Sequence, residues 1–475
     1  MKLFLFFISA LLLLGLDLNA QTIMSLEDCI QMAQKNSISV KQSYLNNADA
    51  VILEKYSKQQ LLPSLNSSTD ISYNLGRSID PTTNDFLTES FTSQRYSINS
   101  MLTLYNGNKL RNSIKQAMMN RKATEQDIEQ MKRDIALLVA NTYLSILYAK
   151  ENLANARNQY QSTKEQLDKM NKLIDAGLQA PTASLNLEAQ LLSDDQLVIS
   201  RKNDLDKFYL DLKNILLLDD SVKLQIEIPK IDFNKLAEPE FKQLNELYNA
   251  SLQHYPAFSA AEYRIKSAEY QNKIAEAALL PSVNFYAGLS TNYADRAKKI
   301  IGKNEVINNQ TIIFNGEEVS IGFPVSVPVF GTYKYFDQLK DNAGLGLALQ
   351  VRIPIYNKYA TRAQVQRSKL NIESAKLSRE KVLQDVKSNI QASLADAKAA
   401  RLQYLAAKKA YDAQKAAFGN AKTQFDIGTL GTYDYLKAKS MYEQSENTLL
   451  ISKYTYLFKT KILEFYLGEN LSFEK

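Results

Sequence analysis

Few residues in this chain could carry out catalysis. It contains one cysteine, Cys29, and one histidine, His254, so neither a disulfide nor a histidine-built metal site can form within the chain. Cys29 falls in a helical pattern and His254 ends a short helical segment, so we interpret both as packing or surface residues. The sequence contains no phosphate-binding loop, zinc-ligand spacing or nucleophile elbow. The residue inventory therefore predicts a protein without catalytic residues, metal or cofactor, and not an enzyme.

The charge balance argues against nucleic acid as a partner. The chain has 57 basic and 51 acidic residues, a formal net charge of +6, and the excess is spread along the sequence without a basic block. Its 45% hydrophobic and 23% charged residues are close to the averages of globular proteins. Only 15 glycines and 10 prolines occur in 475 residues, and this scarcity suits long helices with few turns.

The first twenty residues have the layout of a secretory signal peptide. They contain one lysine, an apolar core from Leu3 to Leu16 and Ala20 at a plausible cleavage site. The alternative is a transmembrane anchor, but the core is shorter than the roughly 20 apolar residues that a spanning helix needs. Gln21 follows the predicted cut in place of a cysteine, which argues against a lipid anchor there. We expect an exported protein that is periplasmic, secreted or of the β-type outer-membrane class.

The chain contains two copies of one unit. "LLPSLNSS" at Leu61 matches "LLPSVNFY" at Leu279, 218 residues later, and "LTLYNGNKLR" matches "RIPIYNKYAT" with Tyr105 on Tyr356, 251 residues later. The difference between the two offsets places 33 extra residues in the second copy. The predicted organisation is a signal peptide at 1–20, a first repeat at 21–218, an equatorial linker at 219–240, a second repeat at 241–468 and a short C-terminal tail at 469–475.

Long helices dominate both copies. The predicted helical ranges are 25–61, 108–174 and 182–217 in the first copy and 241–280, 361–425 and 432–467 in the second. Large residues recur every seven positions along the longest helices, among them Val139, Ile146, Leu153, Ile390, Ala397 and Tyr404. A heptad repeat of this length predicts helices that pack side by side as coiled coils. At a rise of 1.5 Å per residue, each of the two longest helices would be roughly 100 Å long.

Each copy also contains two stretches in which apolar and polar residues alternate. They lie near 65–76 and 95–105 and near 282–293 and 344–354. Such alternation fits transmembrane strands of a barrel with a polar lumen, and a soluble β-sandwich is the alternative. Four strands cannot close a barrel in lipid, so the membrane interpretation requires several copies of the chain. The loops 77–91 and 294–342 would face the cell exterior, and Asn315-Gly316 predicts a small hairpin in the second loop.

With these features in place, the chain resembles the TolC family of outer-membrane efflux channels. The resemblance is carried by "SLEDCIQMAQKNSISVKQ", the paired "LLPS" strand entries, the "LYNG" and "PIYNK" strand exits, and the breaks "DAGLQAPTASLNLEAQ" and "DIGTLGTYDYLKAKS". It implies a mainly α fold with a membrane β-barrel. By this resemblance, duplicated, long, antiparallel coiled-coil helices would form a periplasmic α-barrel, and four strands per chain would contribute to a shared trimeric twelve-stranded barrel. It also implies a bacterial outer-membrane location, contact with outer-membrane lipid, and a periplasmic adaptor protein linked to an inner-membrane pump.

The resemblance further implies that the two breaks are tips at the periplasmic end of the tunnel, where the adaptor docks and the aperture forms. The residues that match this place are Gly177, Thr182, Ala183, Leu185, Gly428, Thr432, Asp434, Leu436 and Lys437. Some relatives narrow the aperture with acidic residues in both tips. Asp434 matches one such place, whereas Ala183 and Lys437 stand at two others. An acidic ring of that composition is therefore incomplete here.

These inferences predict the passive exit duct of a tripartite efflux or secretion system. Such a duct conducts substrates from the adaptor and pump to the exterior without changing them. The alternative is a structural coiled-coil scaffold of the periplasm or cell surface without a conducting barrel. The sequence is compatible with export of drugs, metals, small molecules or proteins.

Overall fold

The computed structural model describes residues 22–79, 86–88, 90–219, 221–229, 244–314, 316–469 and 471. The predicted signal peptide, much of the predicted linker, most of the predicted tail, and Asn315 lie outside these residues. The chain divides into two compact units, which are described separately. The first unit comprises residues 1–52, 119–266 and 373–475, and the second comprises 53–118 and 267–372.

Three helices of the first copy recur with the same length and spacing in the second copy. Helices α2 (Leu26–Asn36) and α3 (Ile38–Gln59) recur 218 residues later as α6 (Leu244–His254) and α7 (Pro256–Ala277). The 67-residue helix α4 (Lys109–Asp175) recurs 251 residues later as α9 (Ala360–Asp426). The return helices are α5 (Leu185–Leu216) and α10 (Thr432–Tyr466). The spacings are those of the sequence matches.

The first predicted helical segment of each copy, 25–61 and 241–280, consists of two helices, and α6 ends at His254 as predicted. In the second copy Pro256 starts α7, because proline suits the first turn of a helix and restricts the residue before it. In the first copy the backbone of Ser37 leaves the helical region at φ −48° and ψ 126°. The Ser37 hydroxyl accepts a hydrogen bond from the amide of Val40 at 3.4 Å, so it caps the following helix.

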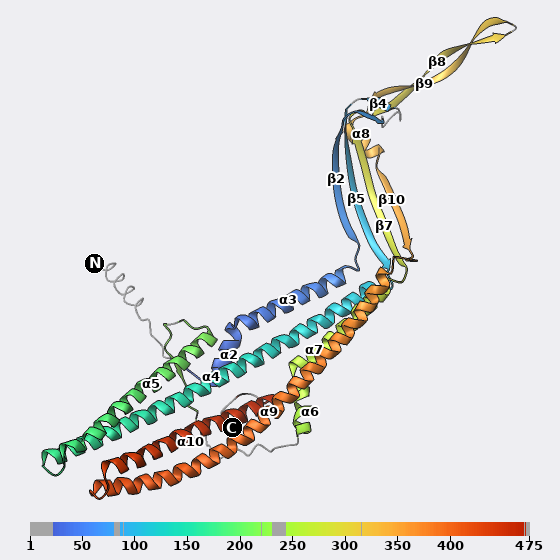
Figure 1. Cartoon of the computed structure of the whole chain (residues 1–475). Helices are drawn as coiled ribbons and strands as arrows, with labels where there is room; N and C mark the ends of the chain where they lie inside the picture. Colours follow the sequence, from blue (N-terminus) through green and yellow to red (C-terminus); the bar gives the residue numbers. More distant parts are fainter. Residues whose placement is uncertain are drawn as a thin grey trace, which may run out of the picture. The chain divides into compact units, whose positions relative to one another are not determined.

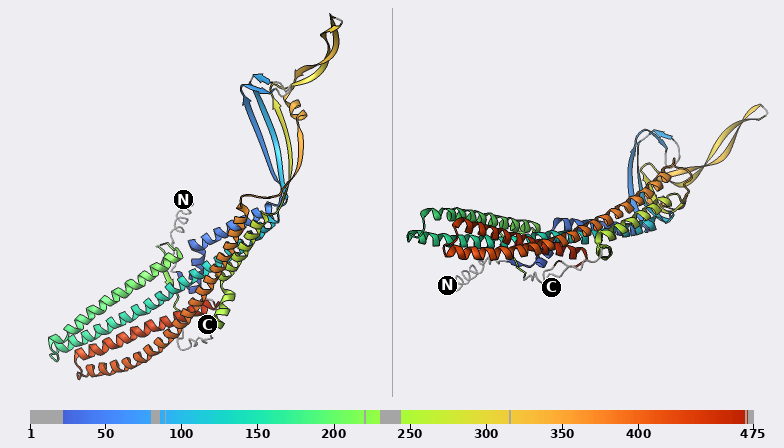
Figure 2. Two further views of the ribbon diagram at one scale, coloured as in Figure 1. Left: turned by 45° about the vertical axis from the view of Figure 1, so that its right-hand side comes forward. Right: turned by 60° about the horizontal axis from the view of Figure 1, so that its bottom comes forward.

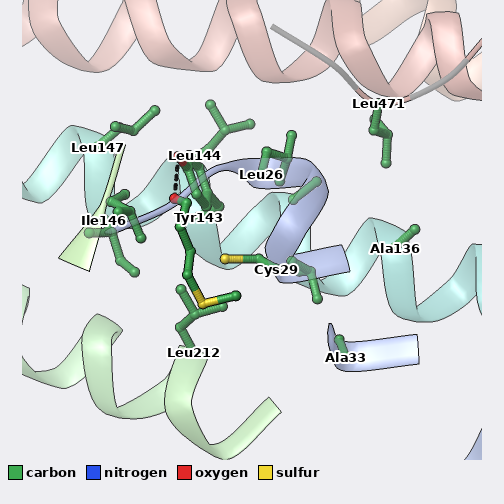
Figure 3. Packing of buried hydrophobic residues seen from close by; sticks show 14 of the residues in the cluster. Leu26, Cys29, Ala33, Ala136, Tyr143, Leu144, Ile146, Leu147, Leu212 and Leu471 are labelled. Atoms are coloured by element: carbon green, nitrogen blue, oxygen red, sulfur yellow. Dashed lines mark hydrogen bonds between the residues drawn. The ribbon is translucent and has the colours of Figure 1, made fainter. Parts of the chain in front are cut away.

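The core of the first unit surrounds helix α2 (Figure 3). Cys29 is fully buried there beside Tyr143, which confirms its interpretation as a packing residue. Strand β1 (Thr22–Met24) pairs in parallel with β6 (Leu224–Ile226), and the Tyr143 hydroxyl donates to the carbonyl of Glu227 at 2.7 Å. Neither strand was predicted, because three residues are too short to show a period.

The seven-residue spacing of the long helices is confirmed. Figure 2 shows α4 with α5 and α9 with α10 as two antiparallel hairpins that lie side by side. Six of the heptad residues predicted to face the neighbouring helices are buried, namely Val139, Ile146, Leu153, Ile390, Ala397 and Tyr404. In the part of the chain that the structure describes, no helix is long and apolar enough to cross a membrane.

The second unit contains a four-stranded antiparallel sheet (Figure 1). Its strand order is β10 (Gly344–Arg352), β7 (Ser282–Ala294), β5 (Phe91–Tyr105), β2 (Ser64–Asn74). The register places the predicted apolar residues on one face, which we call the apolar face. Its exposed members include Leu65, Ile71, Ile98, Leu289, Leu345, Leu347, Leu349 and Val351. The opposite face carries polar and small residues such as Asn99, Asn284 and Gly346.

The longer of the two loops folds into more than the small hairpin predicted from Asn315-Gly316. Strands β8 (Lys298–Phe314) and β9 (Glu317–Thr332) pair along their whole length, and helix α8 (Tyr335–Asp341) follows. The shorter loop contains β3 (Arg77–Ile79) paired with β4 (Phe86–Thr88). The 33 extra residues of the second copy thus lie in a part of the chain that includes a two-stranded ribbon.

Candidate functional site

The two breaks in the helical pattern are tight turns with closely similar backbones. Gly177 has φ +72° and Gly428 has φ +78°, values that glycine adopts without strain. The amide of Leu178 donates to the carbonyl of Leu173 at 2.9 Å, and that of Thr429 donates to the carbonyl of Gln424 at 2.9 Å. These are Schellman-type caps, which satisfy the last carbonyls of α4 and α9. The predicted reversals at Gly177 and Gly428 are therefore present.

The two tips differ after the turn. In the second tip, α10 begins at Thr432 as predicted. In the first tip a 3-10 turn, Pro181–Ala183, comes before α5, which begins at Leu185 and not at the predicted Thr182. Proline at the start of this turn lacks the amide hydrogen that a helix interior would need. Thr182 is exposed, and Ala183 belongs to the backbone of the turn.

The remaining predicted tip residues do not form one cluster. Leu185 and Asp434 are exposed, and so is Lys437. Leu436 instead packs with an apolar cluster whose buried members are Leu167, Met170 and Leu187. The structure thus divides the predicted residues into surface groups and one packing residue.

Contacts between the tips join the two copies. Phe425 of α9 packs against the same apolar cluster that α4 and α5 form, and its ring stacks on Tyr435 of α10 at a centroid distance of 4.4 Å. Next to it, the Lys169 ammonium lies 2.8 Å from the Asp426 carboxylate. Both groups of this ion pair are partly exposed, so we expect little stability from it.

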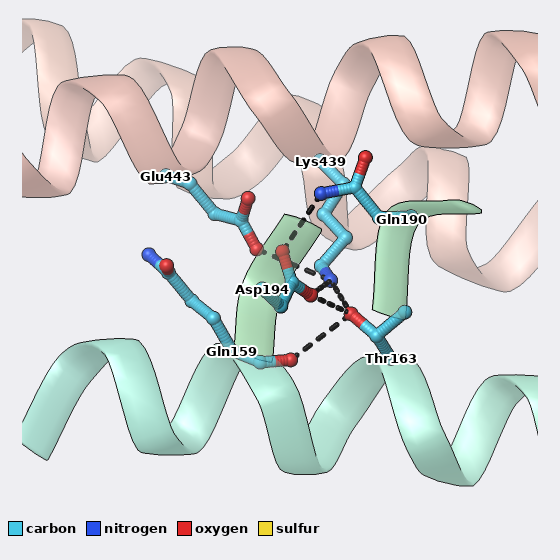
Figure 4. A network of polar contacts seen from close by, with 6 residues as sticks. All are labelled: Gln159, Thr163, Gln190, Asp194, Lys439 and Glu443. Atoms are coloured by element: carbon cyan, nitrogen blue, oxygen red, sulfur yellow. Dashed lines mark hydrogen bonds and ion pairs between the residues drawn. The ribbon is translucent and has the colours of Figure 1, made fainter. Parts of the chain in front are cut away.

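A buried polar network lies farther from the tips, between α10 and the first hairpin (Figure 4). Lys439 of α10 points into it, and 4% of its side chain is exposed. Its ammonium lies 3.5 Å from the Asp194 carboxylate, 3.2 Å from that of Glu443, and in hydrogen-bonding contact with the Thr163 hydroxyl. Gln190 donates to Asp194 at 2.8 Å. One cation therefore neutralises two carboxylates away from water.

Sequence reasoning missed this network. It selected Lys437, two residues before Lys439, because only the resemblance pointed to this part of the chain. A signal was present, since Lys439 and Lys453 lie four residues after the heptad positions Tyr435 and Leu449. Charged residues beside a heptad seam indicate polar contacts between helices. Lys453 indeed lies 2.9 Å from the carboxylate of Glu151 on α4.

The network predicts a pH effect on stability. Burial raises the pKa of the Glu443 carboxyl above its usual value of 4.5, and the Lys439 charge opposes this shift. Because the folded state binds this proton more tightly than the unfolded state, its stabilising contribution is complete below pH 4.5 and is lost as the pH rises through the raised pKa. We expect the melting temperature of the wild type, relative to Glu443→Gln, to fall as the pH rises above 4.5 and through the raised pKa of Glu443.

Thermal melts of the two proteins across this pH range would check the expectation. A difference in melting temperature that does not change with pH would contradict it.

Neither the tips nor the network offers a metal site. Within the described ranges, no group of three or more histidine, cysteine, aspartate or glutamate side chains is placed to hold a metal ion. The site consists of two turns with similar backbones, an apolar cluster that joins them, and a buried charge network farther along the hairpins. The apolar cluster and the charge network hold the two hairpins together, and this contact fixes the positions of the tips.

Comparison with known sequences is consistent with this arrangement. The sequence profile of the outer membrane efflux protein family matches residues 29–216 and 247–469, which is most of the chain and falls in two segments. Outer membrane protein TolC of Salmonella enteritidis is 23% identical over 472 residues, which cover 96% of this chain and 85% of that protein.

Solved structures share the fold. A crystal structure of CusC aligns with a TM-score of 0.74 and 17% identity, covering 94% of this chain and 92% of that one. The outer membrane protein VceC of Vibrio cholerae aligns with a TM-score of 0.74 and 15% identity, covering 94% and 97%. The matched repeats, the four-stranded sheet and the two helical hairpins are thus accounted for together, and the chain belongs to the outer membrane efflux protein family, whose members are channels of the bacterial outer membrane.

Proposed function

We propose that three copies of this chain form the passive exit duct of a tripartite export system. Substrates would enter from a periplasmic adaptor and an inner-membrane pump and leave to the exterior unchanged, so the duct itself needs no catalytic residue. The observation that carries the proposal is the four-stranded sheet with one apolar face, whose edge strands β10 and β2 have no further partner among the described strands. Free edges cannot remain unpaired in lipid. Pairing β10 of one copy with β2 of the next satisfies both edges and gives twelve strands in a trimer.

The return helix α5 supports association of copies in the helical part. Leu185, Leu192 and Ile199 lie seven residues apart on α5, and all three are exposed. Their counterparts 251 residues later are Leu436, Glu443 and Leu450 of α10. Leu436 packs on the first hairpin, Glu443 joins the polar network, and Leu450 is buried.

Leu185, Leu192 and Ile199 form an exposed apolar stripe on α5, and the repeat suggests what covers it in the assembly. Within one chain, the second hairpin lies against the first through α10. If the same relation continues around a ring, α5 of one copy lies against α9 and α10 of the next copy. The stripe formed by Leu185, Leu192 and Ile199 would then be the seam between copies.

The tips are proposed as the adaptor contact and the aperture. Thr182, Ala183 and Leu185 of the first tip and Thr432, Asp434 and Lys437 of the second lie beside the turns at Gly177 and Gly428. Asp434 and Lys437 are both exposed and of opposite charge. Three copies would present alternating charges and not an acidic ring, so we do not expect strong selection of cations by this tip.

Fractionation of the full-length protein tests the proposal. Expressed with its own N-terminus, it should be recovered from the outer membrane with detergent, as an oligomer that resists dissociation in dodecyl sulfate until heated. Planar-bilayer recordings of that oligomer should show ion conductance. Recovery as a urea-soluble periplasmic monomer would instead favour a coiled-coil scaffold and contradict the duct.

The turn glycines give a separate prediction. We expect Gly177→Val and Gly428→Val to loosen their tips, because a β-branched residue is strained at positive φ, whereas asparagine tolerates it. Nothing lies within 4 Å of a Cβ built at either glycine, so the effect would come from the backbone alone. The valine variants should be cut several times faster than the wild type near the tips in limited proteolysis, and the matched asparagine variants should not. Equal cleavage of valine and asparagine variants would contradict this reason.

A further inference from the structure

Helix α8 lies in the part of the second copy that contains the extra residues, and the duct as proposed does not require it. The Gln338 side chain holds it to the end of β7, accepting from the amide of Ala294 at 3.0 Å and donating to its carbonyl at 3.1 Å. Thr291 donates to the carbonyl of Leu339 at 2.6 Å, and Asn342 donates to that of Asn292 at 2.8 Å. The helix is therefore fixed on the sheet.

The contacts of α8 place it on the apolar face. The Tyr335 hydroxyl lies 2.6 Å from that of Tyr96 on β5 and 3.1 Å from the Gln94 side chain, and its ring packs on Tyr293 of β7 at a centroid distance of 4.7 Å. In the strand register, Tyr96 and Tyr293 share a face with Ile98 and Leu289. Helix α8 thus covers one end of the apolar face, over the two central strands of the sheet.

The helix exposes a large apolar side chain from this fixed position. The Phe336 side chain is 79% exposed, and its ring meets Tyr335 edge-on at a centroid distance of 5.3 Å. Lys334 and Lys340 are exposed near the two ends of the helix. Asp337 is exposed as well. Outer-membrane barrels carry girdles of aromatic residues at both membrane interfaces, and long basic side chains near an interface keep their charge in water.

A second copy of the chain is a poor candidate to cover Phe336. Copies would join at the edge strands β10 and β2, whereas α8 is held by residues of β5 and β7. The apolar face on which α8 lies is the one that the proposed barrel turns toward lipid. Continuity with that face therefore points to lipid and not to protein.

We propose that α8 is an interfacial anchor that inserts Phe336 at the boundary between the headgroups and acyl chains of the outer leaflet. Lys334 and Lys340 extend toward the headgroups, where long basic side chains keep their charge hydrated. The anchor fixes the depth of the sheet at its outer end. This inference rests on the proposed duct, because it takes the apolar face to be the lipid face.

A tryptophan probe tests the inference in the full-length protein. The chain contains no tryptophan, so Phe336→Trp introduces a single reporter. The oligomer would be reconstituted in phosphatidylcholine vesicles with bromine near the headgroup end or near the methyl end of the acyl chains. The matched control is Tyr433→Trp, an aromatic position in the second tip with 73% of its side chain exposed.

We expect the Phe336→Trp oligomer to emit at shorter wavelength than the Tyr433→Trp oligomer and to lose intensity in the brominated vesicles, most where bromine lies near the headgroups. The Tyr433→Trp oligomer should keep its intensity in all of them. If the Phe336→Trp oligomer is intact and conducts but its emission is not quenched, the anchor is wrong and the duct is unaffected. This holds for red-shifted emission, from a ring in water, and for blue-shifted emission, from a ring covered by protein. Failure of the wild type to form an oligomer or to conduct would count against the duct itself.

Discussion

Replacing Lys439 by methionine is expected to cause a large loss of stability in the helical hairpins. The substitution keeps the approximate volume of the side chain but leaves the carboxylates of Asp194 and Glu443 buried without their cation. Removing one partner of a buried ion pair costs about 3–5 kcal/mol. The melting temperature, followed by far-UV circular dichroism, should fall accordingly. The loss should shrink at low pH, where the Glu443 carboxyl takes up a proton.

Two control variants isolate the cause. Lys439→Met combined with Asp194→Asn and Glu443→Gln removes the stranded charges and should regain most of the stability. Lys169→Met breaks an ion pair whose lysine side chain is 51% exposed, and it should cost no more than about 1 kcal/mol. If Lys439→Met were as stable as Lys169→Met, the network would not carry the energy assigned to it.

Introducing a charge at Leu192 is expected to weaken association of the copies. The side chain is 73% exposed in the single chain and is the central member of the α5 stripe. If this stripe is the seam between copies, Leu192→Asp buries a carboxylate in each seam. A cost of about 3 kcal/mol per seam should lower the temperature at which the oligomer dissociates in dodecyl sulfate below that of the wild type.

The neighbouring residue supplies the matched comparison. Ser193 is also exposed and lies next to Leu192 on a different side of α5, so Ser193→Asp adds the same charge outside the stripe. It should dissociate at the wild-type temperature. Equal dissociation temperatures for Leu192→Asp and the wild type would show that the α5 stripe does not lie between copies, even if the strands still hold the copies together.

Much of this fold could be predicted because it is repetitive. Heptad positions such as Leu153 and Ile390 recur so often that a few exceptions do not hide the period. The strands were placed by their alternation and by the matched "LLPS" entries. Gly177 and Gly428 were recognised because a glycine interrupts each long helical run at the same offset.

The features that escaped prediction depend on contacts distant in sequence. Whether Lys439 is solvated or buried depends on Asp194 of another hairpin. The residues near Lys439 in the sequence do not indicate this pairing. The break at Ser37 has no proline to mark it, unlike its counterpart before Pro256. The β8–β9 ribbon did leave a sign, since Val319, Ile321, Phe323, Val325 and Val327 alternate strictly, but the Asn-Gly pair drew attention to the turn alone.

The ribbon also indicates where foreign sequence could be carried. Its turn contains Gly316 at φ +88°, with nothing within 4 Å of a Cβ built there. Because β8 and β9 pair only with each other among the described strands, a peptide inserted at this turn would leave the ladder, the four-stranded sheet and the heptads in register. If the loops face the exterior as expected, each oligomer would display an epitope or affinity tag on living cells, once per chain.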